Sequence, residues 1–175
     1  MYRVRVLQLD RAVRRDSSAA LNIPGAVAAA VCNAVALRRT LKLPREDTTV
    51  YRLINSEGDN CSGLIVDVYG RHAVAVASAG WVLQHVEGIT AVLKEEAVGV
   101  SEVIWRYDSS MLEMEGVPAA AVPEATAVGG SSAPVPSTAG MAEDEELLEV
   151  MEEGIKYKLD PYGQKTGMVC IFPGL

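Results

Sequence analysis

The chain has 175 residues and a formal net charge of −7. Hydrophobic residues make up 49% and charged residues 22% of it, a balance typical of globular proteins that excludes a chain disordered throughout. The charge is uneven: residues 1–45 hold nine Lys or Arg against two acidic residues, whereas residues 46–175 hold seven against twenty-one. This excludes a uniformly basic nucleic-acid-binding protein but allows a basic N-terminal arm on an acidic body.

Cysteine and histidine are few and widely spaced. The three cysteines, Cys32, Cys61 and Cys170, form no CxxC pair, and neither histidine lies at a metal-ligand interval from them. The sequence therefore predicts no metal site and no disulfide framework, and a reducing compartment. The longest apolar stretch, about 12 residues ending at Leu37, is too short for a membrane span. We expect no membrane partner and no secretion.

The first quarter of the chain predicts a strand followed by a helix. Residues 2–9 alternate apolar residues with Arg3 and Arg5, which indicates a half-buried strand with a cationic outer face. An Ala-rich helix is predicted from Gly25 to Leu43 because apolar residues recur at helical spacing. Pro24 suits its first turn, and the proline after Leu43 ends it.

The next segment predicts the order β-β-β-α-β. Apolar-polar runs bounded by turn residues predict strands at 50–55, 63–68, 73–78 and 102–107, and an amphipathic helix is predicted over 80–97. The fold class is therefore α+β, with a small mixed sheet and a helix packed on one face.

The composition changes after residue 116. Residues 117–142 hold eight Ala and four Pro with one charge, so we expect a disordered insert or linker. Residues 143–153 carry seven carboxylates and predict a short solvated helix, and residues 154–160 alternate like a strand.

Few motifs carry chemistry. Glu57, Asp59 and Asp67 could form a metal or acid-base cluster, but acidic residues in hairpin turns more often make turn hydrogen bonds, which is the favoured interpretation. Gln164-Lys165-Thr166-Gly167 resembles half of a phosphate loop without its leading glycine, and no GxGxxG fingerprint occurs. His72 and His85 have no nucleophile partner and are interpreted as surface residues. No catalytic residue is predicted.

The basic N-terminal part is the one feature that suggests nucleic acid. Cationic side chains there could contact RNA phosphates with salt-dependent affinity. A basic face that serves solubility, or that docks on the acidic half, is an equally good interpretation. The predicted RNA-binding residues are Arg3, Arg5, Arg14, Arg15, Arg38 and Arg39.

Three segments in order resemble a known family. They are Leu37-Arg38-Arg39, the stretch 51–70 with its Tyr-Arg-Leu-Ile-Asn-Ser-Glu-Gly-Asp and Gly-Leu-Ile-Val-Asp-Val-Tyr-Gly runs, and the Gly-Gln-Lys-Thr-Gly run at 163–167. This pattern resembles the S-adenosylmethionine-dependent large-subunit rRNA cytosine-5 methyltransferases that carry an N-terminal PUA domain. The resemblance implies an RNA-binding barrel, a central α+β domain and a catalytic Rossmann-like domain.

The resemblance implies the following division of this chain. Residues 1–22 would be a remnant of the PUA-like domain, 23–116 the central domain, 117–142 the insert, and 143–175 a linker and the start of the methyltransferase domain. Complete members use S-adenosylmethionine, a Gly-rich loop and a catalytic cysteine, to which Cys170 does not correspond. We therefore expect a truncated member that binds no S-adenosylmethionine and transfers no methyl group.

Two other functions remain open on the sequence alone. One is a non-enzymatic RNA-binding or adaptor module that contacts ribosomal RNA. The other is a protein-interaction piece whose acidic segment 143–153 binds a basic partner. The compartment is undetermined, either the cytoplasm or a plastid or mitochondrial ribosome.

Overall fold

The computed structural model describes residues 23–97, 99–123, 126–128 and 148–159. The strand expected at 2–9, the residues Arg3, Arg5, Arg14 and Arg15, and the motif at 163–167 lie outside this part of the chain. No helix within the described ranges is long and apolar enough to cross a membrane.

A five-stranded mixed sheet forms the centre of the fold. Its strand order is β1 (Val50–Asn55), β2 (Leu64–Tyr69), β3 (His72–Ala77), β4 (Glu102–Tyr107) and β5 (Thr126–Val128). Neighbouring strands are antiparallel except β3 and β4, which are parallel. The predicted α+β class with a small mixed sheet is confirmed, and the four strands expected before residue 116 begin and end within one residue of their predicted bounds.

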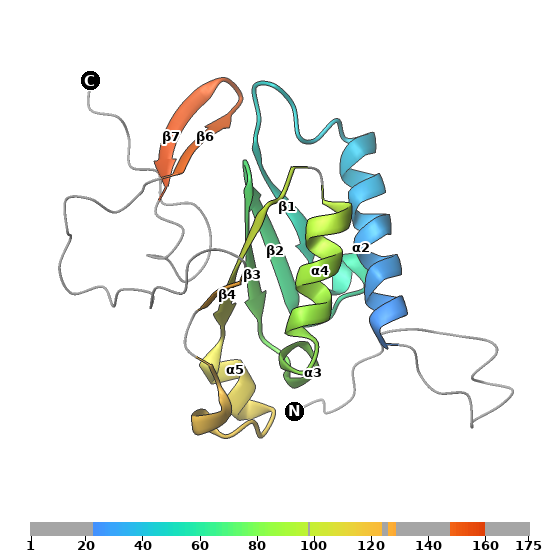
Figure 1. Ribbon diagram of the computed structural model, residues 1–175, viewed down its shortest axis with the longest axis vertical. Coiled ribbons are helices and arrows are strands. Elements are labelled where there is room, and N and C mark those ends of the chain that lie inside the picture. Colours follow the sequence, from blue (N-terminus) through green and yellow to red (C-terminus); the bar gives the residue numbers. More distant parts are fainter. Residues whose placement is uncertain (1–22, 98, 124–125, 129–147, 160–175) are drawn as a thin grey trace, which may run out of the picture.

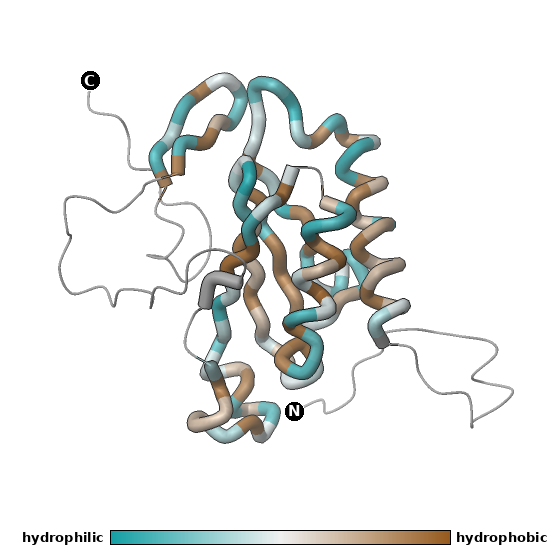
Figure 2. The backbone as a smooth tube through the Cα atoms, in the orientation of Figure 1, coloured by the Kyte–Doolittle hydropathy of each residue, from teal (hydrophilic) through white to brown (hydrophobic). Residues whose placement is uncertain are grey.

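Two helices cover one face of the sheet. α2 (Ile23–Thr40) and α4 (Val86–Glu96) lie side by side on it, as Figure 1 shows. Val31 of α2 and Leu93 of α4 share a fully buried apolar cluster with Val66 and Trp105 of the sheet. The Trp105 indole N–H donates to the Thr90 hydroxyl of α4 over 2.8 Å, so the one polar atom of this ring is satisfied. In Figure 2 the apolar residues run along the central strands.

The helix predicted over 80–97 is broken in two. α3 (Gly80–Leu83) precedes α4, and His85 between them has a non-helical backbone with φ −128° and ψ 16°. The Trp81 indole N–H donates to the carbonyl of Ser62 over 2.8 Å, which holds α3 over the end of the sheet. Local helical spacing cannot show a hydrogen bond to a residue in another element. The spacing alone therefore predicts one continuous helix.

Short elements follow β4 at the same end of the sheet as α3. They are α5 (Ser109–Met114), whose N-cap Asp108 accepts from the Met111 amide, and the 3₁₀ turn η2 (Ala119–Ala121). β5 then pairs with β4, although it falls within the predicted insert 117–142. The beginning of that segment is thus joined to the sheet, whereas residues 129–142 lie outside the described part of the chain.

A β-hairpin replaces the helix predicted in the acidic segment. β6 (Leu148–Glu152) and β7 (Ile155–Leu159) pair antiparallel through a two-residue turn at Glu153 and Gly154, which have φ of 50° and 81°. Positive φ at both central residues is typical of a type I′ turn, whose backbone twist matches that of the paired strands. The helix prediction is therefore wrong for residues 148–152, while the strand predicted over 154–160 is confirmed as β7. Residues 143–147 lie outside the described ranges.

The hairpin packs on the face of the sheet opposite the helices. Val150 and Leu159 are buried there with Tyr69, Val74 and Ile104. Backbone hydrogen bonds join the hairpin to the loop before β1: the Thr49 amide donates to Met151 over 2.7 Å, and the Gly154 amide to Asp47 over 2.8 Å. The apolar contact with the sheet explains why this segment is a strand: alternation places Leu148, which is half-buried, and Val150, which is buried, on the side that packs against the sheet.

Strand β1 forms one edge of the sheet and carries a bulge. Arg52 pairs with Asp67 and Ile54 with Val66, so Leu53 is an extra residue on β1. Both Leu53 and Ile54 are buried as a result.

Gly63 provides a test of this packing. Its φ is +85°, and a Cβ at this position would lie 2.4 Å from the Ala79 Cβ. Gly70 also has a positive φ, of +60°, but nothing lies within 4 Å of its added Cβ. We expect Gly63→Ala to lower the free energy of unfolding by about 3 kcal/mol or more, from backbone strain and overlap together. Gly70→Ala, which has the strain alone, should cost about 1 kcal/mol.

Urea denaturation of the two variants and the parent chain measures these costs. Equal losses in the two variants would show that the close approach of Gly63 to Ala79 does not contribute.

Candidate functional site

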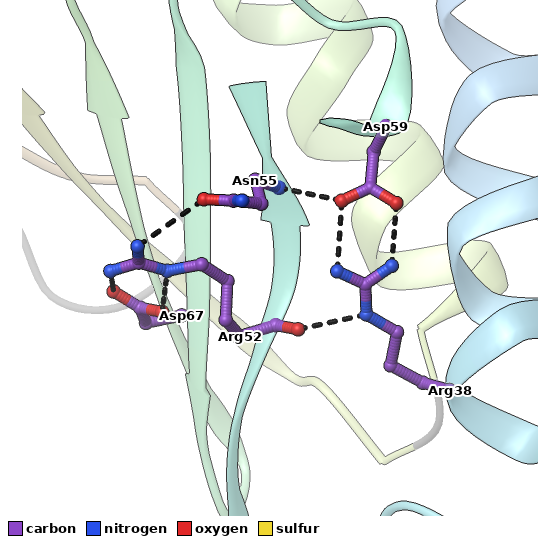
Figure 3. Close-up of polar contacts among 5 residues, drawn as sticks. All are labelled: Arg38, Arg52, Asn55, Asp59 and Asp67. Atoms are coloured by element: carbon purple, nitrogen blue, oxygen red, sulfur yellow. Dashed lines mark hydrogen bonds and ion pairs between the residues drawn. The ribbon is translucent and has the colours of Figure 1, made fainter. Parts of the chain in front are cut away.

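The best-defined polar site surrounds β1 and involves both faces of the sheet (Figure 3). On the helical side, the Arg38 guanidinium of α2 donates to both carboxylate oxygens of Asp59, over 2.5 and 2.8 Å. Its Nε donates to the carbonyl of Arg52 over 2.9 Å. Arg38 and Asp59 are each 9% exposed, so this is a buried bidentate ion pair.

Local structure places Asp59 for this contact. It lies in the 3₁₀ turn η1 (Ser56–Asp59), which Asn60 closes in the left-handed conformation with φ 59°. The Asn55 amide donates to the second Asp59 oxygen over 2.7 Å. Burial raises the pKa of Asp59. The hydrogen bonds from Arg38 and Asn55, together with the charge of Arg38, lower it by more than burial raises it, so the pKa lies below its usual value.

A second ion pair lies on the opposite face. Arg52 donates to the two oxygens of Asp67 over 2.9 and 3.1 Å, and its side chain is 42% exposed. Arg52 also donates to the Asn55 side-chain oxygen over 3.4 Å. The backbone of Arg52 thus accepts from the buried pair while its side chain forms the exposed one.

The acidic residues Glu57, Asp59 and Asp67 have separate partners. Glu57 accepts from the Ser62 hydroxyl over 2.6 Å, and the other two carboxylates pair with different arginines. Within the described residues, no group of three or more His, Cys, Asp or Glu side chains could hold a metal ion. The three carboxylates therefore stabilise the hairpin and its attachment to α2.

The structure separates the two described members of the predicted RNA-binding set. Arg38 is enclosed between α2 and β1, and its guanidinium is used in internal contacts, so its geometry favours a structural role rather than RNA binding. Arg39, the next residue, is exposed. The other members of the set lie outside the described ranges.

His72, His85 and Cys61 show no sign of an activated nucleophile. His72 lies 3.3 Å from a Glu102 oxygen, and the His85 ring is 6.5 Å from that of Trp81, so both rings have protein neighbours at the surface. Burial, with the charge of Asp59 adding to it, raises the pKa of the Cys61 thiol to about 11. Cys61 is thus protonated at neutral pH, unlike a nucleophilic cysteine.

The parallel strands are where an open α/β sheet would bind a nucleotide-like cofactor. Here the chain passes from β3 to α3 through Ser78 and Ala79 without a Gly-rich loop. The first amide of α3, that of Gly80, donates to the Glu115 carboxylate over 2.8 Å. The described residues after β3 therefore do not fit S-adenosylmethionine.

Comparison with solved structures identifies the architecture. The chain is similar to "A putative sam-dependent methyltransferase from Streptococcus mutans", with a TM-score of 0.58 and 19% identity over 81% of this chain and 31% of that chain. It is also similar to "SMU.776, a putative methyltransferase complexed with SAH", with a TM-score of 0.56 and 19% identity over 81% and 30%. The fold is shared.

The chain matches only a part of each of these two structures. The chain spans less than a third of the length of these two structures. No protein-family model matches the sequence, and no curated protein matches it either. The sequence-based domain boundaries stay predictions.

Sequence reasoning missed the partner of Arg38. Arg38 continues the helical spacing of the buried residues Val27, Val31 and Ala34, which places it on the apolar face of α2. A cation on the buried face of a helix needs a buried counter-ion, so the position of Arg38 could have indicated that it forms an internal ion pair. The identity of Asp59 as that counter-ion depends on the tertiary approach of η1 to α2.

The two ion pairs make a matched comparison. Asp59→Asn leaves the Arg38 charge buried without its anion, and we expect a loss of about 3–5 kcal/mol in the free energy of unfolding. Asp67→Asn removes the exposed pair and should cost at most about 1 kcal/mol. Urea denaturation at neutral pH checks both values.

The buried pair also predicts acid sensitivity. The pKa of Asp59 is lowered by folding, so its contribution is complete above the unfolded pKa of about 3.9 and is lost as the pH falls below it toward the folded pKa. Stability measured from pH 6 down to about pH 2 should fall more steeply in the parent chain than in Asp59→Asn. Parallel curves would rule out this role of Asp59.

Proposed function

We propose that this chain is part of an S-adenosylmethionine-dependent methyltransferase of ribosomal RNA, with cytosine C5 of the large-subunit rRNA as the methylated atom. The observation that carries the proposal is the fold shared, over 81% of this chain, with two structures described as methyltransferases, one of them complexed with SAH. The rRNA and cytosine specificity rest on the resemblance of residues 37–70 and 163–167 to that family.

The chain would contribute RNA positioning and not methyl transfer. The connection from β3 to α3 does not fit S-adenosylmethionine, because the Gly80 amide already donates to Glu115 and no Gly-rich loop is present between Ala77 and Gly80. Cys61 is a buried thiol and cannot supply a thiolate at neutral pH. The cofactor would be bound by complete members through a separate catalytic domain.

RNA contact would come from cations near the end of α2 and from the N-terminal segment. Arg39 and Lys42 are both exposed. Arg3, Arg5, Arg14 and Arg15 would extend this surface as the remnant of an RNA-binding domain. In the alternative function, a non-enzymatic RNA-binding adaptor, the same cations would contact RNA without any methyltransferase.

The acidic segment 143–153 is proposed to bind a basic protein partner.

Binding of an rRNA fragment by the 175-residue chain tests the RNA contact. We expect the triple variant Arg14→Ala, Arg15→Ala and Arg39→Ala to bind more weakly across all RNA sequences. The slope of log affinity against log salt should fall by about 0.7 for each phosphate of a single strand that the variant no longer neutralises. Fluorescence anisotropy at several salt concentrations measures both, with Lys158→Ala as a control for the removal of a charge on the hairpin.

Two results would contradict parts of the proposal. Absence of RNA binding by the parent chain at low salt would remove the RNA role. Micromolar binding of S-adenosylmethionine in calorimetry, or transfer of a labelled methyl group to rRNA, would contradict the proposal that the chain lacks the cofactor-binding and catalytic parts.

A further inference from the structure

We propose that the hairpin β6–β7 opens from the sheet as a unit, and that the turn 45–49 before β1 is the latch that holds it closed. The hydroxyl of Thr48 is the central group of this latch. In the open state the hairpin leaves the outer sheet face, while β1 to β4, α2 and α4 stay folded. This inference concerns a motion of the domain and goes beyond the proposed RNA role, on which it does not depend.

The Thr48 hydroxyl is the point at which the latch and the hairpin meet. It accepts from the Glu153 amide over 3.1 Å and from the Arg45 guanidinium over 2.9 Å, and it donates to Asp47 over 3.1 Å. A hydroxyl has one proton to donate and two lone pairs, so these three contacts use its full capacity. Because Thr48 is only 6% exposed, water has little access to this point and cannot readily replace the hydroxyl.

Further hydrogen bonds continue the attachment on both sides of this hydroxyl. The Thr49 amide donates to the Met151 carbonyl over 2.7 Å, and the Met151 amide donates to the Thr49 hydroxyl over 3.0 Å. The Gly154 amide donates to the Asp47 carbonyl over 2.8 Å. The Thr49 carbonyl accepts from the amide of Gly70, in the turn between β2 and β3, over 2.8 Å. The latch is therefore bonded to the sheet on one side and to the hairpin on the other, and the two lie next to each other in Figure 1.

The hairpin is a separate structural unit. β6 and β7 form a two-stranded sheet of their own beside the five-stranded one. Their apolar contact with the large sheet buries Val150 and Leu159, whereas Ile155 is 56% exposed. An isolated two-stranded hairpin is marginally stable in water, and units with few buried apolar contacts open at a lower free energy than the core. The hairpin is thus expected to open before the sheet unfolds.

The larger core of the domain lies on the opposite face of the sheet. It includes Leu93 of α4 and Trp105 of β4, beneath the two helices. On the outer face, the sheet residues buried with the hairpin are Tyr69, Val74 and Ile104. Opening therefore uncovers these three side chains and leaves the larger core intact.

The closed latch also fixes the direction of the chain. Leu159 is the last described residue, and it is buried on the outer face as part of the hairpin. With the latch closed, the chain continues from one defined point on the sheet. Release of the latch would free that point and expose an apolar patch in the same step.

Amide hydrogen exchange in the full chain, followed by NMR at several urea concentrations, tests this motion. The amides of Met151, Glu153 and Gly154 report the hairpin, and those of β2 and β3 report the sheet. In the parent chain we expect the hairpin amides to exchange faster than the sheet amides. Their exchange should also depend less on urea, because opening exposes less surface than unfolding of the whole domain.

Four variants separate the latch from the core. Thr48→Val removes the hydroxyl, and we expect the hairpin amides to exchange roughly tenfold faster, whereas Thr48→Ser should stay much closer to the parent chain. Ile89→Val removes one methyl group beneath α4 and should accelerate exchange in β2 and β3 roughly fivefold. It should leave the hairpin amides unchanged, because the open state keeps this core. Thr40→Val removes an exposed hydroxyl from α2 as a control, and the hairpin amides should exchange as in the parent chain.

Three results would overturn the inference. The first is exchange of the hairpin and of β2 and β3 with one free energy and one urea dependence in the parent chain, since the hairpin would then leave only when the domain unfolds. The second is equal acceleration of hairpin and sheet by Ile89→Val, which has the same meaning. The third is parent-like exchange in Thr48→Val, which would remove the role of Thr48 as the latch. The first two measurements do not require Thr48→Val to fold, and none of the three depends on RNA binding.

Discussion

The ion pair between Arg38 and Asp59 is the contact on which the arrangement of this domain depends. It joins the C-terminal half of α2 to the turn between β1 and β2, across a sequence separation of 21 residues. A third hydrogen bond, from Arg38 to the Arg52 carbonyl, fixes α2 against β1 itself. Because both side chains are buried, loss of either one leaves an uncompensated charge, and the helix and the hairpin are held to one relative position.

The two sides of β1 therefore make different contacts. The helical side is closed by the buried pair and by the apolar cluster beneath α2 and α4. The outer side is partly covered by the hairpin β6–β7, which packs on Tyr69, Val74 and Ile104. The same residue, Arg52, contributes its backbone to the first side and its guanidinium to the second.

Much of the sheet was predictable because its information is local. Apolar-polar runs and flanking turn residues are enough to predict β1 to β4, although three consecutive residues are buried in the middle of β3 and of β4. The break at His85, the hairpin strand β6 and the pairing of Arg38 were not predictable in this way. Each depends on a distant partner: the Ser62 carbonyl for α3, the outer sheet face for β6, and Asp59 for Arg38.

The bulge at Leu53 and the bond from Arg38 to the Arg52 carbonyl have a consequence for assembly. An edge strand with free backbone groups is a template on which other strands can add, in aggregation or in sheet extension. Here the extra residue Leu53 interrupts the regular spacing of backbone groups in β1, and the Arg38 side chain already donates a hydrogen bond to the Arg52 carbonyl. The sheet is thus protected against growth at this edge, and a protein that contains the domain can place further strands nearby without fusing them to it.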